Sequence, residues 1–471
     1  MTTKYETLAS EVEELIAHGT LKPGDRLMSV REAVANRGIS PATVFEAYYL
    51  LEARGLIEAR PRAGYFVKAV PHPREEPHST PPDVQAQDVA VHDVVQAVLA
   101  PLRDRHIVPL GSAFPSPDLF PLERLARGMG SAMRKLEPRQ LLEDLAPGNA
   151  ELRRQIALRL SAQGVPVVPD EVVITSGAME ALALALQAVT QPGDLVAIES
   201  PSFYGCLRTL ERLRLKAVEV ATHPRTGVQI GSLAEVLRRH PVKACWFMPN
   251  FQNPLGALMP AESKRALVAL LAKHQVPLIE DDVYAELYFS AKRPLPAKAY
   301  DREGWVMHCS SFSKSLAPGY RVGWVSGGRF AQKVERLKLM GTLGVSVPSQ
   351  LAVSHFLKHG AYDKHLRQLR AALAARQQSA LRTIELHFPE DTRLMRPEGG
   401  YFLWLELPEV VDAMALNQAA LARQISLAPG PLFSASGGFT HHLRINFGHP
   451  GEEVMHSALR TLGRMVTEAL K

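Results

Sequence analysis

The chain has 471 residues, 46% hydrophobic and 22% charged, which are the proportions of a globular protein with more than one domain. Its formal net charge of +6 permits a nucleic-acid partner without requiring one. The three cysteines form no C-x-x-C pair, so we expect a reduced, cytoplasmic protein with no metal centre. No apolar run is long enough to span a membrane, and the acidic N-terminus does not fit a signal peptide.

The first 70 residues predict a small helical module that ends in a β-hairpin. Residues 5–18 have the apolar spacing of an amphipathic helix, and Ser29 and Glu32 fit a capping box at the start of a second helix. A third helix begins at Ser40-Pro41, because serine is a favoured N-cap and proline a favoured first helical residue. Two helices joined by a glycine turn predict a helix-turn-helix, and "GLIEARPRAGYFV" predicts the two strands of a wing.

This stretch resembles the GntR family of bacterial regulators. The segments "LMSVR" and "SPATV" correspond to the family motifs L-P-S-x-R and S-R-x-T-V, with Met28 in place of proline and Pro41 in place of arginine. The resemblance implies a winged helix-turn-helix that binds double-stranded operator DNA at the nucleoid. It assigns DNA contacts to Arg31, Ser40, Thr43, Arg62 and Gly64. Charge alone leaves a protein-interaction module open, because residues 1–70 hold nine Lys/Arg and nine Asp/Glu.

Residues 71–104 predict a linker, because "VPHPREEPHSTPPDVQ" is dense in proline and charge and has no apolar period. Within it, residues 90–103 have the composition of a short helix. From 105 to 471, apolar runs such as "LVAIESP" and "VPLIEDD" alternate with helical periods such as "PAESKRALVALLAKH". This alternation predicts an α/β domain with a doubly wound, mostly parallel sheet, in which ligands bind beyond the carboxyl ends of the strands.

The segment "SSFSKSLAPGYRVGW", residues 310–324, contains a candidate reactive lysine. Its S-F-S-K fits the S-x-x-K motif of β-lactamase-type hydrolases, but the S-D-N and K-T-G elements of those enzymes do not occur in the chain. A lysine that forms a Schiff base with pyridoxal phosphate needs an acid near the ring nitrogen and donors for the phosphate. Candidates for these groups follow along the chain in residues 174–182, 201–204, 253–256, 279–284 and 311–321.

The ordered set resembles the fold-type I aminotransferases of classes I and II, from about residue 110 to the C-terminus. The motifs "SFSKSLAPGYRVG", "NPLG" and "PEGGYFLW" carry the resemblance. It implies pyridoxal 5′-phosphate as cofactor and Lys314 as the catalytic Schiff-base residue. It also implies that Asp281 faces the ring nitrogen and that Arg444 binds a substrate or effector carboxylate. It assigns the other cofactor contacts to Gly177, Ala178, Met179, Phe203, Asn253, Tyr284, Ser311, Ser313 and Arg321.

A GntR-type module followed by an aminotransferase-like domain resembles the MocR subfamily of transcription regulators. The resemblance implies a homodimer that senses an amino acid, an amine or pyridoxal phosphate through aldimine exchange at Lys314. Relatives carry a tyrosine that reaches into the neighbouring site, whereas "LLEDLAPG", residues 141–148, contains none. A second interpretation stays open, a working aminotransferase with an autoregulatory or vestigial DNA-binding module, because every group needed for transamination has a candidate.

Overall fold

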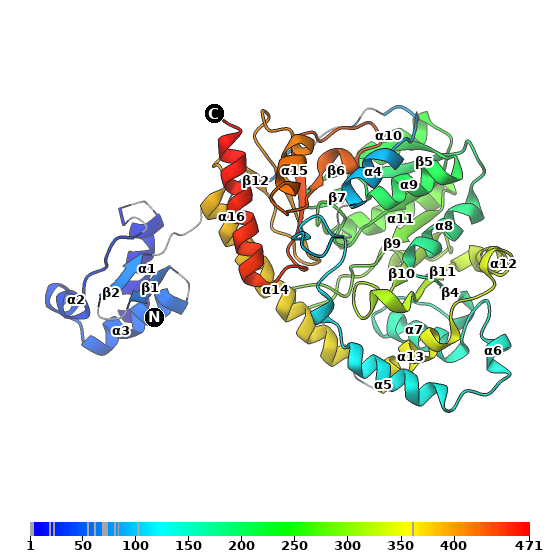
Figure 1. The fold of residues 1–471 in the computed structure, drawn as a ribbon, viewed down its shortest axis with the longest axis horizontal. Coiled ribbons are helices and arrows are strands. Elements are labelled where there is room, and N and C mark those ends of the chain that lie inside the picture. Colours follow the sequence, from blue (N-terminus) through cyan, green and yellow to red (C-terminus); the bar gives the residue numbers. More distant parts are fainter. Residues whose placement is uncertain are drawn as a thin grey trace. The chain divides into compact units, whose positions relative to one another are not determined.

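The computed structural model describes residues 4–17, 20–21, 24–53, 56–60, 63–67, 74–79, 82, 84–100, 104–359 and 362–471. The chain divides into two compact units, residues 1–73 and 74–471 (Figure 1). Among the described residues, no helix is both long and apolar enough to cross a membrane.

The small unit has three helices and a hairpin: α1 (Lys4–Ala17), α2 (Val30–Arg37), α3 (Pro41–Ala53), β1 (Ile57–Arg60) and β2 (Gly64–Val67). The capping box of α2 is present, since the Glu32 N–H donates to Ser29 Oγ and the Ser29 N–H donates to the Glu32 carboxylate. Gly38 ends this helix in the left-handed conformation. The apolar faces meet in a core of Leu8, Val12, Val44, Ala47, Leu51 and Ile57. The predicted helix-turn-helix and wing are confirmed.

The large unit is built on a nine-stranded sheet with the order β3-β6-β5-β8-β9-β10-β11-β4, in which β7 also pairs with β6. Strands β6, β5, β8, β9 and β10 are parallel neighbours, whereas β11 is antiparallel to both β10 and β4. The prediction of a mostly parallel sheet is confirmed. The strands are β3 (Gln87–Asp88), β4 (Val172–Thr175), β5 (Leu195–Ser200), β6 (Lys216–His223), β7 (Gly227–Val228), β8 (Val242–Phe247), β9 (Leu278–Asp281), β10 (Val306–Ser311) and β11 (Gly323–Ser326).

Helices cover both faces of this sheet, as a doubly wound fold requires. On one face α8 (Ala178–Val189) and α9 (Tyr204–Leu213) pack against Val196 and Ile198 of β5. On the other face α10 (Ile230–Arg239) and α11 (Ala261–His274) pack against Leu195 and Ala197 of the same strand. The alternation along β5 follows from the two-residue period of a strand. The remaining helices nearby are α5 (Leu122–Met133), α6 (Gln140–Glu143), α7 (Ala150–Ala162), α12 (Ala331–Thr342) and α13 (Val347–Lys358).

The C-terminal part of the large unit forms a second, antiparallel sheet with the order β12-β13-β15-β14. Its strands are β12 (Arg393–Leu394), β13 (Phe402–Glu406), β14 (Ala428–Pro429) and β15 (His442–Asn446). Its apolar side packs against α14 (Tyr362–His387), α15 (Ala413–Leu421) and α16 (Glu452–Glu468). Figure 1 shows α14 and α16 side by side along this sheet.

Residues 74–79 and 84–100, which composition predicts to be linker, pack on the large unit. The Arg74 guanidinium donates to six backbone carbonyls at and beyond the end of α14, those of Ile384, Glu385, Phe388, Pro389, Glu390 and Thr392. Further along, β3 pairs with β6, and α4 (His92–Leu99) buries Val95 and Val98. The difference from the predicted linker arises because hydrogen bonds to backbone groups order this segment, and composition carries no signal for them.

Candidate functional site

A cavity of about 1120 Å³ opens at the carboxyl ends of β4, β9 and β10. Open α/β sheets bind ligands at this edge, since the loops that follow parallel strands converge there. Most of the predicted cofactor residues line it: Ala178, Met179, Phe203, Asp281, Tyr284, Ser311, Ser313, Lys314 and Arg321. The fold thus gathers side chains that are spread over more than a hundred positions of sequence.

Lys314 lies three residues beyond the end of β10. Its Nζ donates a hydrogen bond of 2.7 Å to the Ala113 carbonyl and lies 3.7 Å from the centre of the Phe114 ring. Burial, assisted by the positive charges of Arg444 and Arg321, lowers the pKa of Lys314 to about 7. The amine is therefore largely neutral just above neutral pH, which is the form that attacks a carbonyl carbon.

Asp281 ends β9 and is 1% exposed. Its Oδ1 has no hydrogen-bond partner among the described residues. Burial, and then the charge of Asp282, raise the pKa of Asp281 to about 7. A buried carboxylate oxygen without a partner is unfavourable, so the position fits a cationic group brought in by a ligand. A protonated pyridine nitrogen is such a group.

Asp282 has a different role from the acid beside it. It accepts hydrogen bonds from Asn250 Nδ2 at 2.8 Å and pairs with His308 Nε2 at 2.9 Å. Despite burial, the hydrogen bond to His308 lowers the pKa of Asp282. Asn250 and His308 were not predicted from the sequence, although a histidine inside the buried strand β10 is a signal for a nearby acid. Of the two consecutive carboxylates, only Asp281 is free to meet a ligand.

A cradle for an anion lies where β4 leads into α8. Gly177 has φ +93°, and a Cβ added there would clash with the Arg321 guanidinium, so glycine is required. Arg321 donates to the Ser176 carbonyl at 2.8 Å and to Ser313 Oγ at 3.2 Å, and the Ser313 N–H approaches Ser311 Oγ at 3.4 Å. A guanidinium, two hydroxyls and the N-terminus of α8 together suit a phosphate.

Arg444 lies on β15 behind the cavity wall and is fully buried. Its guanidinium donates to Asn253 Oδ1 at 3.1 Å and to the Gly111 and Ser112 carbonyls at 2.6 and 3.1 Å. Asn253 Nδ2 in turn donates to the Tyr284 hydroxyl at 3.4 Å. The guanidinium is thus occupied by the backbone of residues 111–112, and a carboxylate would have to replace those two carbonyls. The sequence did not predict residues 111–112 as partners of Arg444, because every residue has a backbone carbonyl.

The residues present fit pyridoxal phosphate. The unpartnered Asp281 oxygen suits the ring nitrogen, the low pKa of Lys314 suits the aldehyde, and the cradle at Arg321 suits the phosphate. Phe203 supplies an aromatic ring on the cavity wall, where its edge lies close to Gly205.

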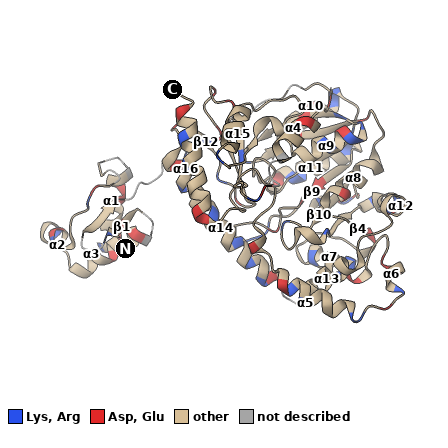
Figure 2. Cartoon of the chain, viewed as in Figure 1, with Lys and Arg blue, Asp and Glu red and all other residues tan. Residues whose placement is uncertain are grey.

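The small unit presents most of the predicted DNA contacts at the starts of its last two helices. Arg31 and Ser40 are exposed, and the Thr43 N–H donates to Ser40 Oγ at 3.2 Å, which fixes the start of α3. Gly64 begins β2 with φ +103°. Arg62 lies outside the described residues. Figure 2 shows residues of both signs of charge along this unit.

Comparisons with known proteins agree with both units. Residues 134–462 match the family "Aminotransferase class I and II", and residues 4–67 match "Bacterial regulatory proteins, gntR family". The chain is 47% identical to the HTH-type transcriptional regulator YdcR of Escherichia coli, over 99% of this chain and 100% of that one. It is 38% identical to YjiR of the same organism, over 100% of both chains.

Among solved structures, the α-aminoadipate aminotransferase LysN of Thermus thermophilus superposes with a TM-score of 0.73 and is 29% identical, covering 82% of this chain and 96% of that one. The aminotransferases of this class depend on pyridoxal phosphate. A GntR helix-turn-helix and a class I and II aminotransferase domain therefore share one chain, which belongs to the MocR-type transcription regulators of the GntR family.

Proposed function

We propose that this regulator holds pyridoxal phosphate at Lys314, senses an amino acid or amine there, and changes its affinity for operator DNA in response. It acts at the nucleoid, in the cytoplasm. The observation that carries the proposal is a half-buried lysine amine with a lowered pKa that shares a cavity with an Asp281 oxygen lacking a hydrogen-bond partner among the described residues, in a chain that also contains a helix-turn-helix. When bound, pyridoxal phosphate supplies an aldehyde that combines reversibly with amines and a ring that withdraws electrons.

Different residues of the chain would bind different parts of the cofactor. Lys314 presents its amine, Asp281 balances the charge of a protonated ring nitrogen, and Arg321 with Ser313 holds the phosphate. Tyr284 and Asn253 offer a hydroxyl and an amide to the ring oxygen. Asp281, Ser313, Tyr284 and Asn253 are buried, whereas Lys314 is half-buried and Arg321 lies exposed on the cavity wall.

Residues 111–114 form the segment of the site that a bound amino acid would displace. The Ala113 carbonyl accepts hydrogen bonds from Lys314 Nζ and from the Tyr401 hydroxyl, while Gly111 and Ser112 occupy Arg444. An amino acid has both an amine and a carboxylate, so it competes with this segment at Lys314 and at Arg444 together. A ligand that binds two arrangements unequally shifts their populations, which is the requirement for regulation. LysN, whose structure contains N-(5′-phosphopyridoxyl)-L-leucine, supports an amino acid as the ligand class.

A homodimer is part of the proposal. Apolar side chains that a monomer leaves in water gather on α6 and at the end of α12: Leu142 is 74% exposed, Leu343 60% and Met340 85%. The two elements are neighbours, since the Ala146 N–H donates to the Leu343 carbonyl. The cavity also reaches Gly341 and Thr342 on α12, so a partner that covers this surface would help to enclose the ligand.

Transamination is the second candidate function, favoured by the presence of every group that the reaction uses. The two functions make different predictions for a keto acid. A sensor returns to its starting absorbance spectrum when the amino acid is removed, whereas an aminotransferase releases a new amino acid from the added keto acid.

The experiment is an absorbance titration of the cofactor-loaded chain with single amino acids and simple amines, followed by operator binding with each ligand that changes the spectrum. We expect at least one amino acid to change both the spectrum and the DNA affinity. Lys314→Ala should abolish both responses, and Lys333→Ala, at an exposed position on α12, should preserve them. A spectral change in Lys314→Ala equal to that of the unaltered chain would contradict the site.

A further inference from the structure

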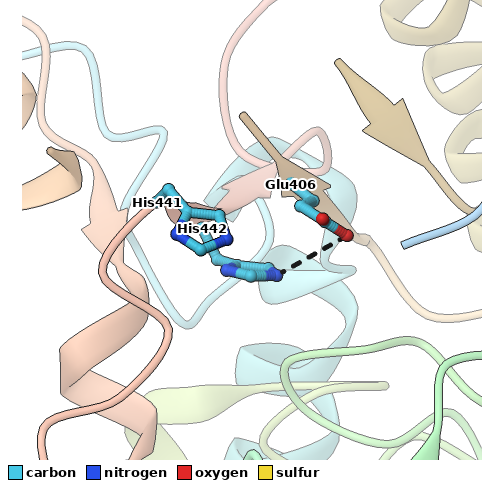
Figure 3. A group of neighbouring side chains, drawn as sticks. All are labelled: Glu406, His441 and His442. Carbon is cyan, nitrogen blue, oxygen red and sulfur yellow. Dashed lines mark ion pairs between the residues drawn. The ribbon is translucent and has the colours of Figure 1, made fainter. Parts of the chain in front are cut away.

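Two histidines and a glutamate meet at one end of the smaller sheet (Figure 3). None of the three is among the residues that line the cofactor cavity. Glu406 ends β13 and lies directly opposite His442, the first residue of β15, in the antiparallel register. One ligand atom from each of Glu406, His441 and His442 lies within 4.8 Å of the others. The expectation of no metal came from cysteine spacing, which contains no information on residues that only strand pairing brings together.

The His442 imidazole is buried without the partners that a buried ring normally has. The residue is 4% exposed, and its Nδ1 has no hydrogen-bond partner among the described residues. Its Nε2 lies 3.9 Å from Glu406 Oε2, beyond hydrogen-bond distance. A buried imidazole nitrogen without a partner is unfavourable, so this ring lacks the contacts that would stabilise it in the absence of a ligand.

Its orientation is set by packing. The Trp404 ring stacks on His442 with 5.2 Å between centroids and 25° between planes, and Phe439 meets the same ring edge-on at 5.4 Å. His441 is only half-buried and lies beside it, with 4.6 Å between ring centroids. One ligand is thus rigid and the other free to adjust.

Glu406 is held from outside the cluster by His78. Its Oε1 lies 2.7 Å from His78 Nδ1, and its Oε2 accepts the His78 backbone N–H at 2.7 Å. Within the described part of the chain, no lysine or arginine forms an ion pair with Glu406, so its negative charge is not neutralised by a fixed cation. Ligating carboxylates are typically oriented by hydrogen bonds of this kind.

We propose that Glu406, His441 and His442 bind a divalent cation of borderline softness, Zn²⁺, with His78 as a positioning residue. Imidazole nitrogens exclude Mg²⁺ and Ca²⁺ as preferred ions, and two histidines with one carboxylate leave a fourth position for water. Zinc bonds of about 2.0–2.1 Å place tetrahedral ligand atoms about 3.4 Å apart. No two ligand atoms are more than 4.8 Å apart, so the widest separation has to close by at most about 1.4 Å, which the half-buried His441 side chain can supply.

The position gives the cation two connections. Through Glu406 it would stabilise the docking of His78, which belongs to residues 74–79, the segment of the large unit that follows the small unit in the chain. Through β15 it lies two residues from Arg444, about 7 Å along the strand. Zinc would thus contact a residue held by the segment 74–79 and would lie close to Arg444, the arginine proposed to hold the effector carboxylate.

The test is a competition titration of the untagged, chelator-stripped full chain with Zn²⁺ and a chromophoric chelator. We expect one equivalent of Zn²⁺ to bind, and His441→Ala and Glu406→Gln each to weaken this binding at least tenfold. His78→Ala should weaken it about 10- to 100-fold, the effect of removing an outer-shell partner. His274→Ala, an exposed histidine at the end of α11, is the matched control and should bind as the unaltered chain does.

Cobalt provides a second readout that does not depend on affinity. Co²⁺ at a site of two imidazoles and a carboxylate should give visible ligand-field bands that disappear in His441→Ala, with the near-ultraviolet circular dichroism of that variant unchanged. Absence of Zn²⁺ binding would overturn the proposal, as would equal affinity in His441→Ala and Glu406→Gln. A thiolate charge-transfer band would also overturn it, because it would place the metal at a cysteine.

Discussion

Gly177→Ala tests whether the turn before α8 is shaped to hold a phosphate. Gly177 has φ +93° and ψ 174°, a region that is essentially restricted to glycine and costs another residue about 1–3 kcal/mol. The new methyl group would also clash with the Arg321 guanidinium, which is held by the Ser176 carbonyl and Ser313 Oγ. Moving the guanidinium removes one charge-assisted phosphate contact, about 1.5–3 kcal/mol. Since about 1.4 kcal/mol is a factor of ten, pyridoxal phosphate should bind roughly 10- to 150-fold more weakly.

The measurement is a titration of the apo chain with pyridoxal phosphate, followed by absorbance and by quenching of tryptophan fluorescence. Gly231→Ala is the matched control, because Gly231 lies in α10 with no atom within 4 Å of an added Cβ. It should leave the affinity unchanged. If Gly177→Ala binds the cofactor as tightly as Gly231→Ala, then Arg321 does not contact the phosphate.

Three further predictions address the lysine, the buried arginine and the wing. Because the pKa of Lys314 is lowered to about 7, cofactor incorporation should accelerate about tenfold per pH unit below pH 7 and level off above it; a rise continuing to pH 10 would show an ordinary lysine. Arg444→Ala should abolish the spectral response to amino acids but keep the response to simple amines, and an unchanged amino-acid response would place the carboxylate elsewhere. Arg62→Ala should weaken operator binding and reduce its salt dependence by about one ion, which an electrophoretic mobility series in salt can measure.

The arrangement of the cofactor site could largely be predicted, because parallel strands end at one edge. Asp281 and Ser311 end adjacent strands, β9 and β10, so their proximity follows once the sheet is recognised. A buried hydrogen bond distinguishes Asp282 from Asp281, since Asp282 pairs with His308 of β10 at 2.9 Å. Sequence shows two consecutive acids and cannot say which one is satisfied.

Contacts made through backbone groups could not be predicted. Lys314 bonds to the carbonyl of Ala113, about two hundred residues earlier, and Arg74 donates to backbone carbonyls such as those of Ile384 and Phe388. Any residue type supplies such an acceptor, so neither motif nor composition identifies the partner. The Glu406–His442 pair could not be predicted from the sequence either, because these side chains meet through the pairing of β13 with β15.

The pairing of β3 with β6 determines where a stable fragment of the large unit can begin. Residues 84–100 cover the start of β6 at Lys216 and Ala217, and they add Val95 and Val98 to the core. A fragment that began at residue 105 would leave this edge without hydrogen-bond partners, beside the apolar core side chains that Val95 and Val98 had covered. Exposed edge strands recruit strands from other molecules, so such a fragment should self-associate. A fragment that begins at Arg74 keeps the edge closed and should stay dispersed at the same concentration.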